Sequence, residues 1–209
     1  HRAAEAFFPQ KDLSELELVH ALINQLPNHC CLHLANSMSV RYANFIGMPT
    51  NKKHVQVFAN RGTSGIDGCT STAVGHAIAS DAMHILITGD LAFFYDRNAF
   101  WHNYPMANLR VVLLNNHGGA IFKMIDGPAT LPESDEYFVT QQKLNARKLC
   151  EEFGFEYLRL DNKRKLHHLL PDFFEPSNTV KILELETDVN TTKNIFNNFK
   201  EKIKNAYEL

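Results

Sequence analysis

Two short apolar runs near the middle of the chain each end in small polar residues, and this feature constrains the fold most strongly. The runs 84–88 and 110–114 are aliphatic and partly β-branched; Asp90 lies just beyond the first, and Asn116 just beyond the second. Asp90 and Asn116 are 26 residues apart. A parallel strand pair needs a crossover connection of a dozen or more residues, usually a helix. The spacing therefore predicts a strand, a crossover helix and a parallel strand.

The polar ends of these two strands predict a ligand site. Parallel strands place their carboxyl ends at one edge of the sheet, where open α/β sheets bind ligands. The Asp90 carboxylate, the Asn116 amide oxygen and a carbonyl of the turn 116–119 supply half of an octahedral oxygen shell. Mg²⁺ prefers such a shell and completes it with phosphate oxygens and water. Gly, Asp and Asn also dominate ordinary turns, but the two pairs at this spacing favour a metal-bound diphosphate.

The rest of the chain alternates between strand-like and helix-like patterns. We expect a single three-layer α/β domain, with a mainly parallel six-stranded sheet and helices on both faces. The residues 125–138, with two prolines and several acids, predict a loop in a position suited to a lid. The expected strands are 31–34, 54–58, 84–88, 110–114, 156–160 and 180–186, and the expected helices are 12–27, one starting at Ser37, 67–80, 141–153, 163–174 and 191–207. Asp12 is the expected cap of the first helix, with Pro27 as its stop.

Composition excludes several classes of function. A chain of 209 residues with 44% apolar residues fits one domain, 1–209, with 1–11 as a linker or leader. A net charge of −2 gives no basic field for nucleic acid or an acidic membrane. No apolar stretch approaches the ~20 residues of a membrane span, and no signal-peptide pattern opens the chain. We therefore expect a cytoplasmic location.

We predict structural rather than functional roles for the side chains outside the expected site. The four cysteines lack metal spacing and are expected to be buried, reduced thiols. The eleven histidines show neither HxH nor HExxH spacing, so no metal site is assigned to them. Trp101 and the phenylalanines are expected in the core. For the helix at 67–80, Ser64 or Asp67 is the expected N-cap.

Four strings in order resemble one family. They are ANSMSVR at 35–41, NRGTSGIDG at 60–68, GDLAFFYDRNA at 89–99 and NNHGGAIF at 115–122. The GD and NN pairs are typical of thiamine diphosphate enzymes, and the longer strings resemble the carboxyl-terminal domain of the MenD branch, the 2-succinyl-5-enolpyruvyl-6-hydroxy-3-cyclohexene-1-carboxylate synthases of menaquinone biosynthesis. The resemblance covers about the first 125 residues. Leu91, where most thiamine diphosphate enzymes have glycine or serine, is also typical of this branch.

The resemblance implies roles for particular residues. Asp90, Asn116 and the Gly118 carbonyl would hold Mg²⁺, or Mn²⁺ in its place. Ile66 would support the bent cofactor, and Gly65 would present its backbone to the aminopyrimidine. Thiamine diphosphate itself would contact Asn36, Ser37, Ser64, Gly65, Ile66, Gly89, Asp90, Leu91, Ala92, Asn116, Gly118, Gly119 and Ile121. The substrates would contact Arg41, Arg61 and Ser37, because guanidinium groups match carboxylates. His117 is left open between a diphosphate contact and a surface position.

The resemblance also implies a larger enzyme. Such an enzyme is a transferase that decarboxylates 2-oxoglutarate and adds the succinyl semialdehyde unit to isochorismate. Its activating glutamate comes from an amino-terminal domain that nothing here matches, so no catalytic residue is assigned in this chain. The chain alone is expected to be inactive, and the whole enzyme to be a homodimer or tetramer. Two alternatives stay open: a domain of an acetolactate synthase-like enzyme or 2-oxoacid decarboxylase, and a noncatalytic phosphate-binding module.

Overall fold

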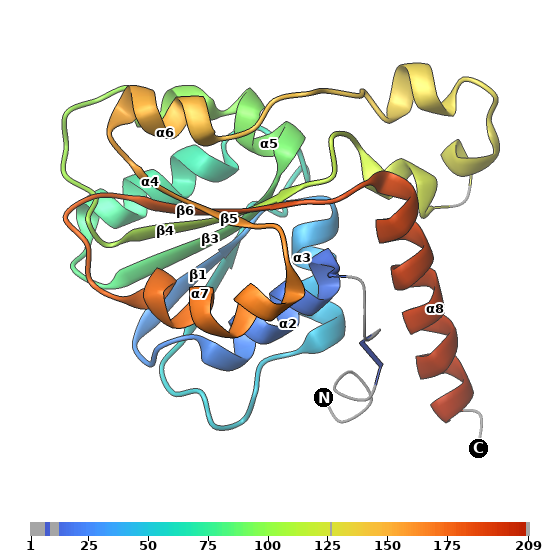
Figure 1. Cartoon of the computed structure of the whole chain (residues 1–209), viewed down its shortest axis with the longest axis horizontal. Helices are drawn as coiled ribbons and strands as arrows, with labels where there is room; N and C mark the ends of the chain where they lie inside the picture. The colour runs from blue at the N-terminus through green and yellow to red at the C-terminus, as the bar shows by residue number, and fades with distance from the viewer. Residues whose placement is uncertain (1–6, 9–12, 126, 208–209) are drawn as a thin grey trace.

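The chain forms a six-stranded sheet between two layers of helices, as Figure 1 shows. The computed structural model describes residues 7–8, 13–125 and 127–207. Every strand pair is parallel, and the strand order is β2-β1-β3-β4-β6-β5. The strands are β1 (Cys30–Leu34), β2 (Gln56–Ala59), β3 (Met83–Gly89), β4 (Leu109–Asn115), β5 (Glu156–Leu160) and β6 (Lys181–Glu186). The predicted three-layer α/β fold is confirmed.

Helices cover both faces because the central strands are apolar on both sides. The longer helices are α2 (Glu15–Gln25), α3 (Met38–Ile46), α4 (Cys69–Ala79), α5 (Asp90–Tyr95), α6 (Arg147–Phe153), α7 (Leu166–Phe174) and α8 (Val189–Tyr207). In β3, Ile85 and Ile87 join the core cluster that includes α2, α3, α7 and α8. Leu86, between them, faces the cluster that includes α4, α5 and α6. Among the described residues, none of the helices has the length and apolar character that a bilayer crossing demands.

Some local predictions were wrong. The helix expected at 141–153 begins only at Arg147, because Gln142 reaches back to Asp90 and the Glu184 carboxylate accepts from the Ala146 N–H at the start of α6. Trp101 was expected in the core but is 83% exposed. The expected cap Asp12 lies outside the described residues; Ser14 caps α2 by accepting from the Glu17 N–H.

Other predictions can be compared directly with the structure. All four cysteines are free and buried, as expected. The stretch expected as a loop contains the short helical turns Pro128–Thr130 and Ser134–Phe138. Of the expected leader 1–11, only residues 7 and 8 are described, and both phenylalanines pack against the core. Ser64 and Asp67 do not cap α4, which instead begins after Gly68 in a left-handed conformation.

Arg110 ties β4 to the end of α7. It is 1% exposed, and its Nε and Nη2 atoms donate to the carbonyls of Phe173 and Glu175, both at 2.7 Å. Its Nη1 donates to the carbonyls of Ala107 and Leu109. The last carbonyls of a helix have no partner within the helix, so this guanidinium satisfies acceptors that burial would otherwise leave unpaired.

Arg110→Lys is expected to lower the free energy of unfolding by about 2 kcal/mol, because one ammonium cannot reach all four carbonyls and a buried unpaired acceptor is costly. Urea unfolding of the protein measures this change. Arg97→Lys is the control: Arg97 forms an exposed ion pair with Glu152, and such pairs contribute little. Equal losses for the two variants would contradict the assigned role of Arg110.

Candidate functional site

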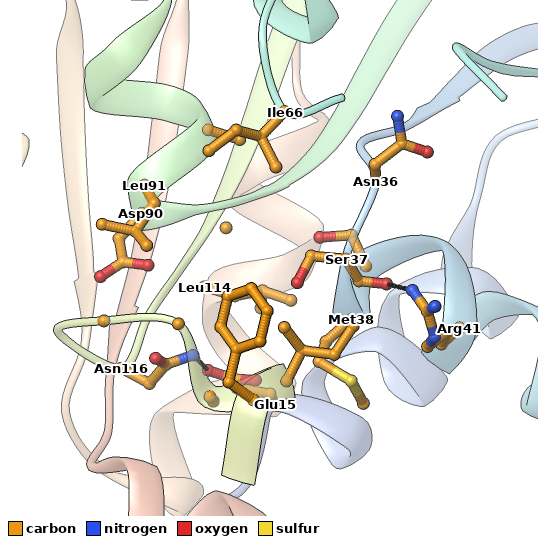
Figure 2. A pocket seen from close by; sticks show the side chains of 18 of the residues that line it. Glu15, Asn36, Ser37, Met38, Arg41, Ile66, Asp90, Leu91, Leu114 and Asn116 are labelled. Atoms are coloured by element: carbon orange, nitrogen blue, oxygen red, sulfur yellow. Dashed lines mark hydrogen bonds between the residues drawn. The ribbon is translucent and has the colours of Figure 1, made fainter. Parts of the chain in front are cut away.

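One pocket of about 460 Å³ lies at the carboxyl ends of β1, β3 and β4. Every residue predicted for the cofactor, the metal or the substrates lines it. Figure 2 shows Asp90 and Asn116 at one end of the pocket and Asn36 and Arg41 at the other. Phe122, which the family resemblance also places near the cofactor, lines the pocket, and five further lining residues were not predicted: Glu15, Met38, Ser39, Leu114 and Ala120. The residues come together as the strand-end argument requires, while their roles remain predictions.

The register of two strands brings Asp90 and Asn116 to one edge of the sheet. Gly89 of β3 pairs with Leu114 of β4. Asp90 is the first residue of α5, and Asn116 directly follows β4. Both side chains are buried, at 2% and 7% exposure. The predicted proximity of the carboxylate and the amide therefore follows from parallel pairing alone.

The Asp90 carboxylate is buried beside a neutral donor. Its Oδ2 accepts from Gln142 Nε2 at 2.7 Å. Burial raises the pKa of Asp90, while hydrogen bonds from Gln142 and from the backbone of Leu91 and Gly118 oppose the rise. Within the described part of the chain, no lysine or arginine forms an ion pair with it. A buried carboxylate without a cationic partner is costly, and a bound cation would supply that partner.

The Asn116 amide nitrogen has a hydrogen-bond partner, but its amide oxygen has none in the described residues. Its Nδ2 donates to Glu15 Oε1 at 2.8 Å. Its Oδ1 is buried and has no hydrogen-bond partner in the described residues. A buried polar atom without a partner calls for an explanation such as an ion or water. An amide oxygen in the same pocket as the Asp90 carboxylate fits the hard-ligand preference of Mg²⁺.

Glu15 fixes the orientation of Asn116 and was missed at the sequence level. It lies at the start of α2 and is 1% exposed. Its carboxylate also accepts from the Tyr42 hydroxyl at 2.9 Å and the Thr187 hydroxyl at 3.3 Å. Burial raises the pKa of Glu15 to about 7 against these hydrogen bonds. Because Oε1 accepts from the amide nitrogen, the Asn116 oxygen must face the pocket.

The glycine turn after Asn116 is tightly packed. A Cβ on Gly118 would lie 2.9 Å from both Cγ1 and O of Val139. A Cβ on Gly119 would lie 2.9 Å from the Phe122 ring and 3.0 Å from the Phe138 carbonyl. Glycine is therefore required at both positions by the packing of segment 138–139 and of Phe122. His117, just before the turn, does not line the pocket; its Nε2 lies 3.5 Å from Glu186 Oε2.

At the other end of the pocket, Asn36 joins two loops. Its Nδ2 donates to the carbonyls of Asn60 and Gly65, at 2.7 and 2.6 Å, and its Oδ1 accepts from Arg61 Nη1 at 2.9 Å. Arg41 Nη1 donates to the Ser37 carbonyl at 2.7 Å. The Asn36 side chain therefore positions the loop of Gly65 and Ile66. Arg41 and Arg61 both line the pocket.

Three of the six non-glycine residues with positive φ angles in the described part of the chain lie in or beside this site. Ser37, Ser64 and His117 have positive φ angles of 69°, 58° and 63°. Such conformations are unfavourable for residues with a Cβ and cluster at binding and active sites. Ser37 and Ser64 line the pocket itself, and His117 adjoins the two glycines that line it. Strained turns at three strand ends support a ligand-binding role for this edge of the sheet.

The comparisons with known proteins agree with the geometry. The family model of the thiamine pyrophosphate enzyme C-terminal TPP binding domain matches residues 37–183. The chain is 54% identical over 95% of its length to a 2-succinyl-5-enolpyruvyl-6-hydroxy-3-cyclohexene-1-carboxylate synthase of Cytophaga hutchinsonii, of which the match covers 35%. A synthase of the same name from Bacteroides fragilis is 39% identical over 94% of the chain, and the match covers 35% of that relative. One from Christiangramia forsetii is 36% identical over 88% of the chain, and the match covers 31% of that relative. The chain spans about a third of the length of these curated relatives.

Proposed function

Because the chain belongs to the thiamine pyrophosphate enzymes and contains their C-terminal TPP-binding domain, we propose that it forms the diphosphate-binding part of a MenD-type synthase. The whole protein would be a transferase of menaquinone biosynthesis that joins a unit from 2-oxoglutarate to isochorismate. The relatives named as such synthases support this reaction. The observation that carries the proposal is the buried Asn116 oxygen, which finds no hydrogen-bond partner in the described part of the chain, in the same pocket as the buried Asp90 carboxylate.

The metal would be Mg²⁺, or Mn²⁺ in its place, held by Asp90, Asn116 and the Gly118 carbonyl. Gln142 holds Asp90, and Glu15 holds Asn116, so both side chains are oriented before any ion arrives. Partners of this kind contribute strongly to metal affinity in proteins. The remaining positions of the shell would go to diphosphate oxygens and water.

Thiamine diphosphate supplies the carbanion chemistry when bound, and the protein supplies orientation and electrostatics. Apolar side chains of this pocket, Ile66, Leu91 and Ile121, would contact the cofactor rings. The loop of Gly65 and Ile66 is held in place by the Asn36 amide. Gly89, Ala92 and Gly119, which also line the pocket, would leave room for the cofactor at the strand ends.

Arg41 and Arg61 would bind the substrate carboxylates, with Ser37 between them and the cofactor. Both guanidinium groups line the pocket and are anchored through one nitrogen, to the Ser37 carbonyl and to the Asn36 amide oxygen. A planar guanidinium with several donors matches a carboxylate. Anchoring by one nitrogen fixes the direction of the others.

A titration of the whole protein tests the function. Calorimetry with thiamine diphosphate, ATP and NAD, each with and without Mg²⁺, separates the proposal from a noncatalytic nucleotide-binding module. Binding of thiamine diphosphate that depends on Mg²⁺, with no binding of ATP or NAD, is the expected result. Binding of ATP or NAD in place of thiamine diphosphate would overturn the proposal.

The isolated chain is expected to release no CO₂ when given Mg²⁺, thiamine diphosphate, 2-oxoglutarate and isochorismate. The reason is that the activating glutamate is expected from another part of the enzyme, in a neighbouring subunit of a homo-oligomer. The whole protein is the positive control in the same assay. Sustained CO₂ release by the chain alone would mean that an acid within it, with Glu15 the first candidate, activates the cofactor.

A further inference from the structure

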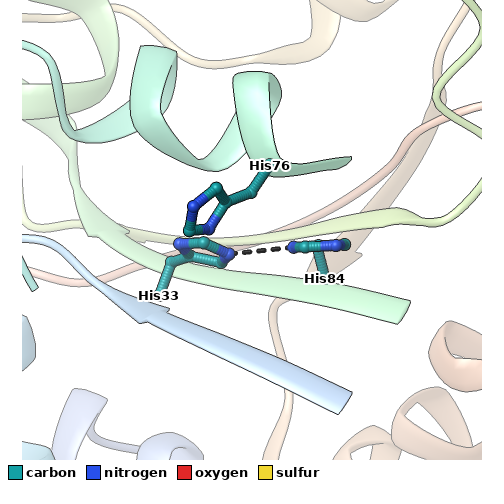
Figure 3. Close-up of side chains that lie close together, drawn as sticks. All are labelled: His33, His76 and His84. Carbon is teal, nitrogen blue, oxygen red and sulfur yellow. Dashed lines mark hydrogen bonds between the residues drawn. The ribbon is translucent and has the colours of Figure 1, made fainter. Parts of the chain in front are cut away.

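Three histidines from three different elements meet on the face of the sheet that α4 covers, as Figure 3 shows. His33 belongs to β1, His76 to α4 and His84 to β3. In the β1–β3 pairing, His33 lies opposite Leu86, two residues along from His84. Side chains two residues apart on a strand point to the same face, so His33 and His84 both face α4. The strand register and the packing of α4 therefore fix this cluster, although no sequence spacing reveals it.

The cluster has the dimensions of a metal site. One potential ligand atom from each imidazole lies within 4.8 Å of the other two. His33 Nε2 and His84 Nδ1 form a hydrogen bond of 3.0 Å, which an ion bound between the two rings would replace. Nitrogens bound tetrahedrally to Zn²⁺ at about 2.0–2.1 Å are separated by roughly 3.3 Å. The His33 and His84 nitrogens thus lie near the required separation, whereas the half-buried His76, whose ligand atom lies within 4.8 Å of theirs, would have to move closer.

Two of the three rings are buried: His33 is 3% exposed and His84 is 1% exposed. Of the two His84 nitrogens, Nδ1 faces His33, and Nε2 is buried without a hydrogen-bond partner in the described residues. Imidazole nitrogens are among the usual ligands of Zn²⁺.

The cluster is separate from the pocket described above. None of the three histidines lines that pocket. The histidine cluster offers nitrogen atoms as ligands, whereas the end of the pocket with Asp90 and Asn116 offers oxygen atoms. Imidazole suits Zn²⁺, Cu²⁺ and Ni²⁺, and carboxylate and carbonyl oxygens suit Mg²⁺. The two places would therefore take different ions by ligand chemistry alone.

We propose that His33, His76 and His84 form a binding site for a transition-metal dication of the Zn²⁺ type. The three ligands join α4 to β1 and β3, so the bound ion fastens that helix to the sheet. With three protein ligands, a fourth position is left for water or an exchangeable ligand. The competing account is a structural cluster without a metal, in which His33 and His84 are hydrogen-bonded and Phe58 stacks on His33 at 5.3 Å and lies edge-on to His76 at 4.8 Å.

The test uses the whole protein with saturating Mg²⁺ and thiamine diphosphate, so that the oxygen site is filled. Calorimetric titration with ZnCl₂ is compared among the unmodified protein, His76→Gln and the control His168→Gln. His168 is exposed on α7 and outside the cluster. We expect about one equivalent of Zn²⁺ to bind the unmodified protein and the control. In His76→Gln this binding is expected to be lost or to weaken at least tenfold.

A second measurement does not depend on any variant. Co²⁺ added to the unmodified protein is expected to give the intense visible absorption of a tetrahedral nitrogen site, and Zn²⁺ is expected to displace it. No Zn²⁺ binding, Zn²⁺ binding of equal strength in His76→Gln, or only weak octahedral Co²⁺ absorption would each overturn the metal site and leave the structural cluster without a metal as the explanation.

Discussion

Asp90→Asn is expected to weaken Mg²⁺-dependent binding of thiamine diphosphate by roughly 1,000-fold, about 4 kcal/mol. Asparagine keeps the size of the side chain and can still accept a hydrogen bond from Gln142. It removes the negative charge, which is the main attraction for a hard dication. Because the volume and the Gln142 contact are kept, the loss reports the charge rather than a change in packing.

Calorimetry with thiamine diphosphate, at a series of Mg²⁺ concentrations, measures the effect of Asp90→Asn. Asp135→Asn is the matched control, since it makes the same chemical change in an exposed residue paired with Lys123. The control is expected to bind like the unmodified protein. If Asp90→Asn also keeps its Mg²⁺ dependence, the metal assignment fails.

Glu15→Leu is expected to raise the Mg²⁺ concentration needed for half-saturation about 100-fold, in line with the loss of a partner that orients a metal ligand. Leucine fills similar space but cannot accept from Asn116 Nδ2, so the amide is free to turn its oxygen away from the pocket. Glutamine in the same place keeps an oxygen that can accept from Asn116, and Tyr42 can accept from its amide nitrogen. Glu15→Gln should therefore lose much less than Glu15→Leu.

The readout for Glu15 must separate positioning from direct catalysis. At saturating Mg²⁺, a positioning role predicts that the kcat of Glu15→Leu returns close to that of the unmodified protein, while the Mg²⁺ requirement stays high. Unfolding without cofactor, followed with urea, checks that the variant folds. A kcat that stays low at every Mg²⁺ concentration, or equal behaviour of the leucine and glutamine variants, would exclude this role.

The sequence was enough to predict the positions of the site residues that directly follow strands. Asp90 and Asn116 meet because parallel strands share one edge, and two runs of apolar residues are enough to predict that arrangement. The family resemblance placed Asn36 and the loop of Gly65 and Ile66 in the same site, and the structure brings them into one pocket. The family resemblance then added a role for each position.

The partners of those residues could not be predicted. Glu15 lies 101 residues before Asn116, and Gln142 lies 52 residues after Asp90. Glu15 belongs to an amphipathic helix, and in such a helix a charged residue is predicted to lie on the solvent-exposed face. Gln142 fell within a predicted helix, yet its side chain holds two strand ends instead. Such contacts depend on how elements pack in three dimensions, which no local pattern encodes.

The same limit explains the histidine cluster and Trp101. His33, His76 and His84 have no motif spacing, because a strand register and a helix position bring them together. Trp101 was assigned to the core by residue type, but it follows a short helical turn that buries Phe100 and leaves the indole exposed. Residue type predicts burial only on average.

The central claim is that Asp90, Asn116 and the Gly118 carbonyl coordinate one divalent ion, to which the cofactor diphosphate also binds. A crystal structure of the whole protein with thiamine diphosphate and Mn²⁺, which gives an anomalous signal in place of Mg²⁺, tests it most directly. The account predicts one anomalous peak about 2.1 Å from a carboxylate oxygen of Asp90, from Asn116 Oδ1 and from the Gly118 carbonyl. A peak elsewhere, with Asn116 Oδ1 turned away from the pocket, would contradict it.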